Sequence, residues 1–260
     1  MTETKPVVHT TEKIYVAGLP FDMVDKAETV RRLCEAMRDR RRLFLSTPNL
    51  NFLVAAQTDE AFKASVLQSD MSVADGMPIL WLARKQGTPL PERVAGSDLF
   101  EALRRGAGRS VLGRPVRVFF FGGLPGVADA ACQLLNDEFA QGGSMQAVGA
   151  LCPGFGDVED MSGQEVLDCI NASGADFLVV ALGAKKGQAW ITHNLPRLQV
   201  PVVSHLGAVV NFVAGTVRRA PEIWQQLGLE WVWRIKEEPA LISRYWHDGL
   251  ALLRLWLKVK

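Results

Sequence analysis

The chain has 260 residues, which suits one large domain or one domain with an appendage. Its 29 Lys and Arg residues nearly balance 28 Asp and Glu residues, so the net charge of +1 excludes a protein-wide basic field for nucleic acid. With 48% hydrophobic and 22% charged residues, the chain is predicted to fold rather than to be intrinsically disordered.

The cysteines and the first residues indicate a cytoplasmic protein. The first 13 residues lack the apolar core of a secretory signal peptide. No run reaches the roughly 18 apolar residues of a membrane span. None of the cysteines lies in a CxxC pair, which predicts reduced, incidental thiols at Cys34, Cys132, Cys152 and Cys169.

The first half of the chain alternates short β-rich runs with helical patterns. Val30, Leu33, Cys34 and Met37, for example, recur at helical spacing. In chain order, the predicted elements are a strand at Lys13–Gly18, a helix at Asp25–Arg40, a strand at Arg42–Ser46, a helix at Asp59–Gln68, a short strand at Met71–Ala74 and a helix at Met77–Lys85.

The second half continues this alternation. In chain order, it contains a strand at Arg117–Gly123, a helix at Pro125–Phe139, and strands at Ser144–Leu151, Asp176–Leu182 and Val200–Ser204, with a helix between the last two. Continuous apolar strands alternating with helices predict a Rossmann-like α/β fold, a mostly parallel sheet with helices on both faces. We predict an N-terminal tail at residues 1–12 and this α/β core at residues 13–217.

The pattern changes at Arg218, after which no further strand is predicted. Residues 218–260 are expected to form a helical appendage rich in Trp and Arg. In its last part, Trp246, Leu250, Leu253 and Leu257 fall on one helical face.

Two predicted strands end in polar residues that suit a ligand site, since ligands of open parallel sheets bind outside the carboxyl ends of the strands. After the second predicted strand, Thr47 and Asn49 can hydrogen-bond a sugar or a carboxylate, although Asn49 can equally cap the next helix. After the third, Asp75 can serve as a general base, or else form an Asp-Gly turn or a helix N-cap.

Two later strand ends are weaker candidates. Gly122 and Gly123 follow an apolar strand and can let a phosphate approach backbone N–H groups, or they can simply form a tight turn before the helix. Lys185, Lys186 and Gln188 follow the strand that ends at Leu182, where a solvated charged turn is the alternative.

Several chemistries have no matching motif. The histidines are scattered without metal-ligand spacing, and there is no GxSxG, Walker lysine or DxD motif. Without DxD, a leaving diphosphate would need protein cations. Arginine suits phosphate oxygens, and the C-terminal segment supplies Arg218, Arg219, Arg234 and Arg244, which can alternatively pair with Glu230, Glu237 and Glu238.

Taken in order, six motifs resemble one family. They are TPNLN, ADG, PERVAGSDLFEAL at Pro91–Leu103, FFFGGLPG, VVALGA, and GTVRRAP followed by GLEWVWRIKEEP within Gly215–Pro239. This series resembles the WecG/TagA/CpsF family of bacterial glycosyltransferases, over roughly Lys13 to Tyr245. The resemblance implies transfer of N-acetylmannosamine, its uronic acid or another hexose from a UDP-sugar to a polyprenyl-diphosphate-linked sugar.

The resemblance also implies residue roles in an inverting transfer with no metal and no cofactor. It assigns the general base to Asp75 and places Thr47 and Asn49 near the reacting sugar. Further substrate contacts are expected at Arg93, Asp98, Gly122, Gly123, Gln188 and Arg218, with Arg234 and Arg244 closing over the diphosphate.

Two departures from the family pattern are visible. The family often has PKQE after the fourth strand, whereas this chain reads AKKGQ, so Gly187 occupies the ungapped glutamine position and Gln188 lies one residue later. Near the end, EPALI replaces EPxRL, and Leu241 stands where an arginine would be. Both changes are of a kind that can alter the donor or the acceptor.

The expected protein is therefore a glycosyltransferase of surface polysaccharide, exopolysaccharide or cell wall synthesis, peripheral to the inner face of the bacterial plasma membrane. The appendage would dock on that membrane, or pack on the core or on a second subunit in a homo-oligomer. The alternatives are a glucosyl- or uronosyltransferase of the same family and, from another class, a non-catalytic nucleotide-binding protein. A dinucleotide-dependent oxidoreductase is disfavoured because its fingerprint is missing.

Overall fold

The computed structural model describes residues 12–221, 224, 230–237 and 242–258. Its centre is a six-stranded parallel sheet with the strand order β4-β3-β8-β7-β5-β6. The strands are β3 (Leu43–Ser46), β4 (Met71–Ser72), β5 (Val116–Gly122), β6 (Met145–Leu151), β7 (Phe177–Ala181) and β8 (Val202–His205).

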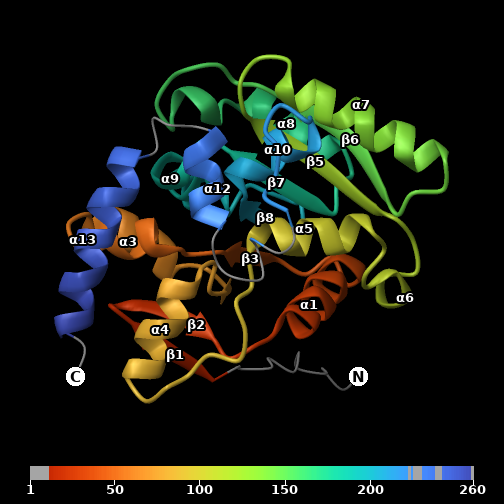
Figure 1. Ribbon diagram of the computed structural model, residues 1–260. Helices are drawn as coiled ribbons and strands as arrows, with labels where there is room; N and C mark the ends of the chain where they lie inside the picture. Colours follow the sequence, from red (N-terminus) through yellow and green to blue (C-terminus); the bar gives the residue numbers. More distant parts are fainter. Residues whose placement is uncertain (1–11, 222–223, 225–229, 238–241, 259–260) are drawn as a thin grey trace, which may run out of the picture.

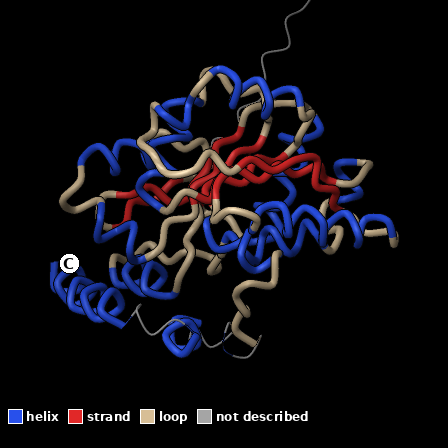
Figure 2. Tube along the Cα trace, turned by 90° about the horizontal axis from the view of Figure 1, so that it is seen from above, coloured by secondary structure: helices blue, strands red, loops and turns tan. Residues whose placement is uncertain are grey.

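Helices cover both faces of this sheet, as Figure 2 shows. The helices of the α/β part are α1 (Lys26–Arg38), α2 (Leu50–Ala55), α3 (Glu60–Leu67), α4 (Met77–Lys85), α5 (Gly96–Arg104), α6 (Arg109–Leu112), α7 (Val127–Ala140), α8 (Gln164–Ala172), α9 (Ala184–Asn194) and α10 (Gly207–Val213), with a short 3-10 turn at Asp160–Ser162. This arrangement confirms the predicted Rossmann-like α/β class.

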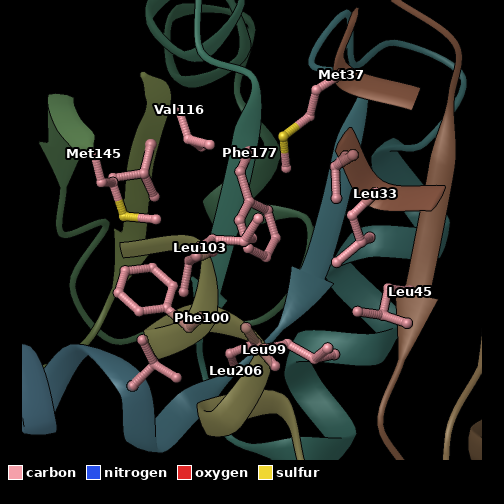
Figure 3. Packing of buried hydrophobic residues seen from close by; sticks show 14 of the residues in the cluster. Leu33, Met37, Leu45, Leu99, Phe100, Leu103, Val116, Met145, Phe177 and Leu206 are labelled. Carbon is pink, nitrogen blue, oxygen red and sulfur yellow. The ribbon is translucent and has the colours of Figure 1, made fainter. Parts of the chain in front are cut away.

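The alternation of side chains along each strand divides the core between the two faces. Phe120 of β5 belongs to the cluster under α1, α5, α7 and α10, whereas Phe119 and Phe121 belong to the cluster under α8 and α9. Figure 3 shows the first cluster, in which Phe100 of α5 lies near Phe177 of β7 with ring centroids 6.4 Å apart. Burial on both faces explains why these strands are continuously apolar.

The predicted first strand does not join the sheet. It is β1 (Lys13–Val16), which pairs with an unpredicted antiparallel partner, β2 (Leu19–Asp22). The chain reverses through Ala17 and Gly18, both at positive φ, as a two-residue hairpin turn requires. Buried residues of this hairpin, α2, α3 and α4 form a third apolar cluster.

The described part of the C-terminal segment is helical, as expected. It contains α12 (Glu230–Glu237) and α13 (Ile242–Lys258), both labelled in Figure 1. Helix α13 lies beside α2 and α4. Leu255 of α13 is buried in the third cluster, and Leu252 packs against it. The N-terminal tail falls almost wholly outside the described residues, as does Leu241, and the domain boundaries stay predictions.

Candidate active site

A cavity of about 660 Å³ opens at the carboxyl ends of the strands. This volume is typical of small-molecule sites. Its walls come from the segments that follow β3, β4, β7 and β8 and from α10, α12 and α13. Four strand ends and the C-terminal helices therefore face one space, as the rule for ligand sites in parallel sheets predicts.

Thr47 and Asn49 follow β3 and line this cavity. The Asn49 side chain also caps α2, because its Oδ1 accepts a hydrogen bond from the Phe52 N–H at 3.3 Å. Thr47 lies against the start of α5: a Cβ on Gly96 would lie 3.2 Å from Thr47 Oγ1. The capping interpretation of Asn49 thus holds together with its position at the cavity.

Asp75 follows β4 and also lines the cavity, with 30% of its side chain exposed. Its backbone N–H donates to the Pro48 carbonyl at 2.9 Å, which ties the β4 end to the β3 end. The N-cap of α4 is Gly76, at φ 144°, and α4 has no side-chain cap hydrogen bond. Asp75 is therefore not the N-cap of α4, and its carboxylate is left for the cavity.

The environment of Asp75 raises its pKa to about 7. Desolvation of the partly buried carboxyl group is the largest cause, and the negative charges of Glu230 and Asp98 add to it. The Arg93 guanidinium, with Nη1 3.9 Å from Asp75 Oδ1, and the backbone N–H of Gly96 act in the opposite direction. A carboxyl group with this pKa exchanges protons near neutral pH, which is where a general base works best.

Asp98, in the first turn of α5, holds two arginines beside the cavity. Its Oδ2 accepts a hydrogen bond from Arg93 Nη2 at 2.8 Å, and its Oδ1 accepts one from Arg219. Arg219 also donates to Ser97 Oγ at 2.9 Å and lies 3.8 Å from Glu230 of α12. This network joins the segment before α12 to the wall that faces Asp75.

Arg219, rather than the predicted Arg218, makes these contacts. Arg218 is exposed and does not line the cavity, although its carbonyl accepts a hydrogen bond from Trp233 Nε1 at 3.3 Å. The pairing of Arg219 with Glu230 follows the alternative in which C-terminal arginines bind acidic helix residues. Because Arg218 and Arg219 are neighbours in the chain, sequence spacing does not indicate which of them contacts the site.

Three other predicted site residues lie away from the cavity. Gly122 is the last residue of β5, and Gly123 follows it in a tight turn. A Cβ on Gly122 would lie 2.7 Å from the Ala181 carbonyl oxygen, and the Gly123 N–H donates to that oxygen at 2.9 Å. Gln188 is fully buried in α9. Its Nε2 donates to Ser46 Oγ at 2.9 Å, so it contacts the last residue of β3 rather than the cavity.

The remaining two predicted residues lie on the C-terminal helices. Arg234 belongs to α12 and Arg244 to α13, and their side chains are outside the described part of the structure. Both helices do reach the cavity, through Glu230 of α12 and through Asp248, Gly249 and Leu252 of α13.

Several cavity residues were not singled out from the sequence. The polar ones include His205 at the end of β8 and Asn211 in α10, and Trp81 of α4 adds an aromatic wall. The position of His205 directly after the predicted strand Val200–Ser204 is a signal that could have identified it. Asn211 and Trp81 lie inside helices, where spacing alone does not distinguish a cavity wall from a surface.

Two further features concern metals and membranes. Across the described ranges, no group of three or more His, Cys, Asp or Glu side chains is placed to hold a metal ion. Of the helices that the structure describes, none has both the length and the apolar character needed to cross a bilayer.

The family assignment agrees with this architecture. The family model described as "Glycosyl transferase WecG/TagA/CpsF family" matches residues 14–260, nearly the whole chain. A match of that length implies glycosyltransferase activity in polysaccharide synthesis. The chain belongs to the WecG/TagA/CpsF family of glycosyltransferases.

Proposed function

We propose that the chain is an inverting, metal-independent glycosyltransferase that moves a hexose from a UDP-sugar to a polyprenyl-diphosphate-linked sugar, with an N-acetylmannosamine-type donor as the first candidate. The observation that carries this proposal is Asp75, a carboxyl group with a pKa of about 7 at the wall of the cavity. The family assignment supplies the reaction class.

In the proposed reaction, the Asp75 carboxylate accepts the proton of an acceptor hydroxyl. The acceptor oxygen then forms a bond to the anomeric carbon on the face opposite the diphosphate. The bond from that carbon to the diphosphate oxygen breaks, and its electron pair leaves with UDP. Attack from the opposite face inverts the anomeric configuration.

The neighbours of Asp75 support this role. Burial keeps the pKa of Asp75 high, although Arg93 is near enough to stabilise the carboxylate form. Asp98 accepts the shorter hydrogen bond of Arg93. Thr47 and Asn49, at the next strand end, are proposed to hydrogen-bond the reacting sugar. Arg234 and Arg244 are proposed to bind the diphosphate, in place of the metal that a DxD motif would hold.

The outer face of α13 supports a location at the inner surface of the plasma membrane. While Leu255 packs on the protein, large apolar side chains on the other face are exposed, at 70% for Trp246, 57% for Leu253 and 74% for Leu257. A helix with one face on the core and an apolar face outward suits the interface of a bilayer. A polyprenyl-linked acceptor would be met there.

The test is a donor panel of UDP-N-acetylglucosamine, UDP-N-acetylmannosamine, UDP-N-acetylmannosaminuronate, UDP-glucose and UDP-glucuronate with short-chain polyprenyl-diphosphate-sugars. UDP release and product mass are measured, with and without a chelator. We expect one donor to be transferred and the chelator to have no effect. Binding of UDP-sugars without transfer to any acceptor would favour the non-catalytic nucleotide-binding protein, and loss of activity with the chelator would contradict the metal-independent reaction.

A further inference from the structure

His205 is a polar cavity residue whose hydrogen bonding is incomplete. It is the last residue of β8, and it lines the cavity next to the end of β3, which leads into Thr47. Its Nε2 is buried and has no hydrogen-bond partner among the described residues. Because Nε2 is closed off by the backbone of Gly187 and Gly207, the nitrogen that a cavity ligand can reach is Nδ1, which also has no hydrogen-bond partner among the described residues. A ligand group that bonds to Nδ1 would satisfy it.

Two glycines make room for the imidazole ring. A Cβ on Gly187 of α9 would lie 2.3 Å from His205 Cδ2, closer than any real contact allows. A Cβ on Gly207 would lie 3.2 Å from Nε2. With the Phe52 ring 6.4 Å away between centroids, the imidazole is held between α9, α2 and the start of α10. A ring held in this way is preorganised for a ligand.

The ring is uncharged at neutral pH. Burial lowers the pKa of His205 to about 4, and no charged group is among the causes, although Asp75, Arg93 and Glu230 line the same cavity. A neutral imidazole has one donor and one acceptor nitrogen. It therefore suits an uncharged hydroxyl or amide group better than a diphosphate, which requires cations.

The position of β8 in the sheet indicates which part of a ligand His205 would contact. β8 is the second strand from β4, whose end carries Asp75. At a strand spacing of about 4.8 Å, the end of β8, which carries His205, and the end of β4, which leads to Asp75, lie on the order of 10 Å apart across the sheet. A single sugar ring with its hydroxyl groups can bridge that distance, with its anomeric carbon toward Asp75.

We propose that His205 recognises the sugar part of the donor, hydrogen-bonding an uncharged hydroxyl or amide group of the transferred hexose. The inference rests on the proposed function, because it takes the ligand to be a UDP-sugar. His205 is then a specificity-determining residue: it selects the hexose, while Asp75 moves the proton.

Calorimetric binding of UDP and of the transferred UDP-sugar tests this role. His205→Ala should weaken UDP-sugar binding about 2- to 12-fold, the effect of one hydrogen bond to an uncharged group, and leave UDP binding unchanged. His205→Gln retains a donor and an acceptor and should recover most of the affinity. The matched control is His193→Gln, at an exposed position on α9, which should change neither affinity. His205→Ser replaces the alanine variant if the latter does not fold.

The possible results separate this inference from the proposed function. Equal weakening of UDP and UDP-sugar binding would mean that His205 contacts the nucleotide, and it would overturn the inference. Unchanged binding of both ligands would overturn it as well. If the wild-type protein bound no uridine nucleotide at all, the proposed function itself would fail.

The contact between Gly187 and His205 provides an independent test. In an otherwise wild-type chain, Gly187→Ala should displace the His205 ring and so lower both the UDP-sugar affinity and the melting temperature. When His205 is already alanine, the new methyl group at position 187 has no imidazole ring to clash with. In that case the change should leave affinity unchanged and raise the melting temperature, because alanine is the better helix former. Equal effects of Gly187→Ala in both backgrounds would show that the two positions are independent and would contradict the proposed packing.

Discussion

The Asp75 carboxyl group is subject to opposing electrostatic effects. Burial and the charges of Asp98 and Glu230 favour its neutral form, whereas Arg93 favours the carboxylate. The outcome, a pKa of about 7, keeps a substantial fraction of carboxylate at neutral pH while making that carboxylate more basic than a free aspartate. The pH dependence of the transfer rate and of the folding stability should therefore report the environment of Asp75.

We expect the rate of sugar transfer to rise with pH through the pKa of Asp75. Because the base acts as the carboxylate, kcat/KM should fall tenfold per pH unit well below pH 7 and level off above it. Initial rates between pH 5 and pH 9 measure this limb. A profile that is flat down to pH 5 would contradict the raised pKa.

The same pKa predicts a stability effect. Since the folded state keeps Asp75 protonated up to about pH 7, whereas an unfolded aspartate loses its proton near its ordinary value of 3.8, the folded state holds the extra proton between these values. Folding stability from this group therefore declines as pH rises through that window. Asp75→Asn removes the charge, so its melting temperature should exceed that of the wild type more at pH 8 than at pH 4.5. If the melting temperatures of Asp75→Asn and the wild type differed equally at pH 8 and at pH 4.5, the raised pKa of Asp75 would be contradicted.

Among the helices, α5 positions both Arg93, which lies beside Asp75, and Arg219. Its core-facing side, including Phe100 and Leu103, is fixed in the cluster of Figure 3, so its first turn holds Asp98 at a set place. Asp98 in turn binds Arg93 and Arg219. Through Arg219 the segment before α12 is attached to the same helix, which brings Glu230 to the cavity.

Asp98→Asn should move the acid limb of the rate profile to lower pH. The substitution removes a negative charge that raises the pKa of Asp75, and it weakens the competing bond to Arg93. Both effects favour the Asp75 carboxylate, so its pKa should fall. The control is Glu101→Gln on the same helix, where Glu101 pairs with Arg104 and Arg105 rather than with cavity residues. A limb that stays in place, or moves to higher pH, would contradict this network.

The outer face of α13 should govern membrane binding. Replacing Leu253 or Leu257 by Glu should reduce cosedimentation with anionic phospholipid vesicles about tenfold or more, since burying one leucine contributes roughly 1.5–3 kcal/mol. Leu124→Glu, at an exposed leucine after β5, is the matched control and should bind like the wild type. Transfer to a water-soluble short-chain acceptor should persist in all three variants. Unchanged vesicle binding would favour packing of this face on a second subunit.

At the scale of the whole molecule, the parallel sheet and the position of the site were predictable, because both depend on local patterns. Strands buried on both faces are continuously apolar, and the rule for strand ends then brings Thr47, Asn49 and Asp75 to one edge. The hairpin was missed because β2, Leu19–Asp22, contains a proline and lacks a clear alternation.

The parts that could not be predicted depend on contacts between distant segments. The choice between Arg218 and Arg219 is decided by Ser97 and Asp98, more than 100 positions away in the chain. Gln188 looks like a site residue after a strand, but the turn of α9 points it to Ser46. The strand end could have pointed to His205, but the space for its ring depends on Gly187 in α9, a contact that the sequence does not reveal.

The most direct test of the account compares turnover and binding in one substitution, Asp75→Asn, using the donor that the panel identifies. We expect kcat to fall about 10²–10⁴-fold, the usual contribution of a general base, while calorimetry gives a UDP-sugar affinity within about threefold of the wild type. Full turnover by the variant would contradict the assignment of Asp75 as the base.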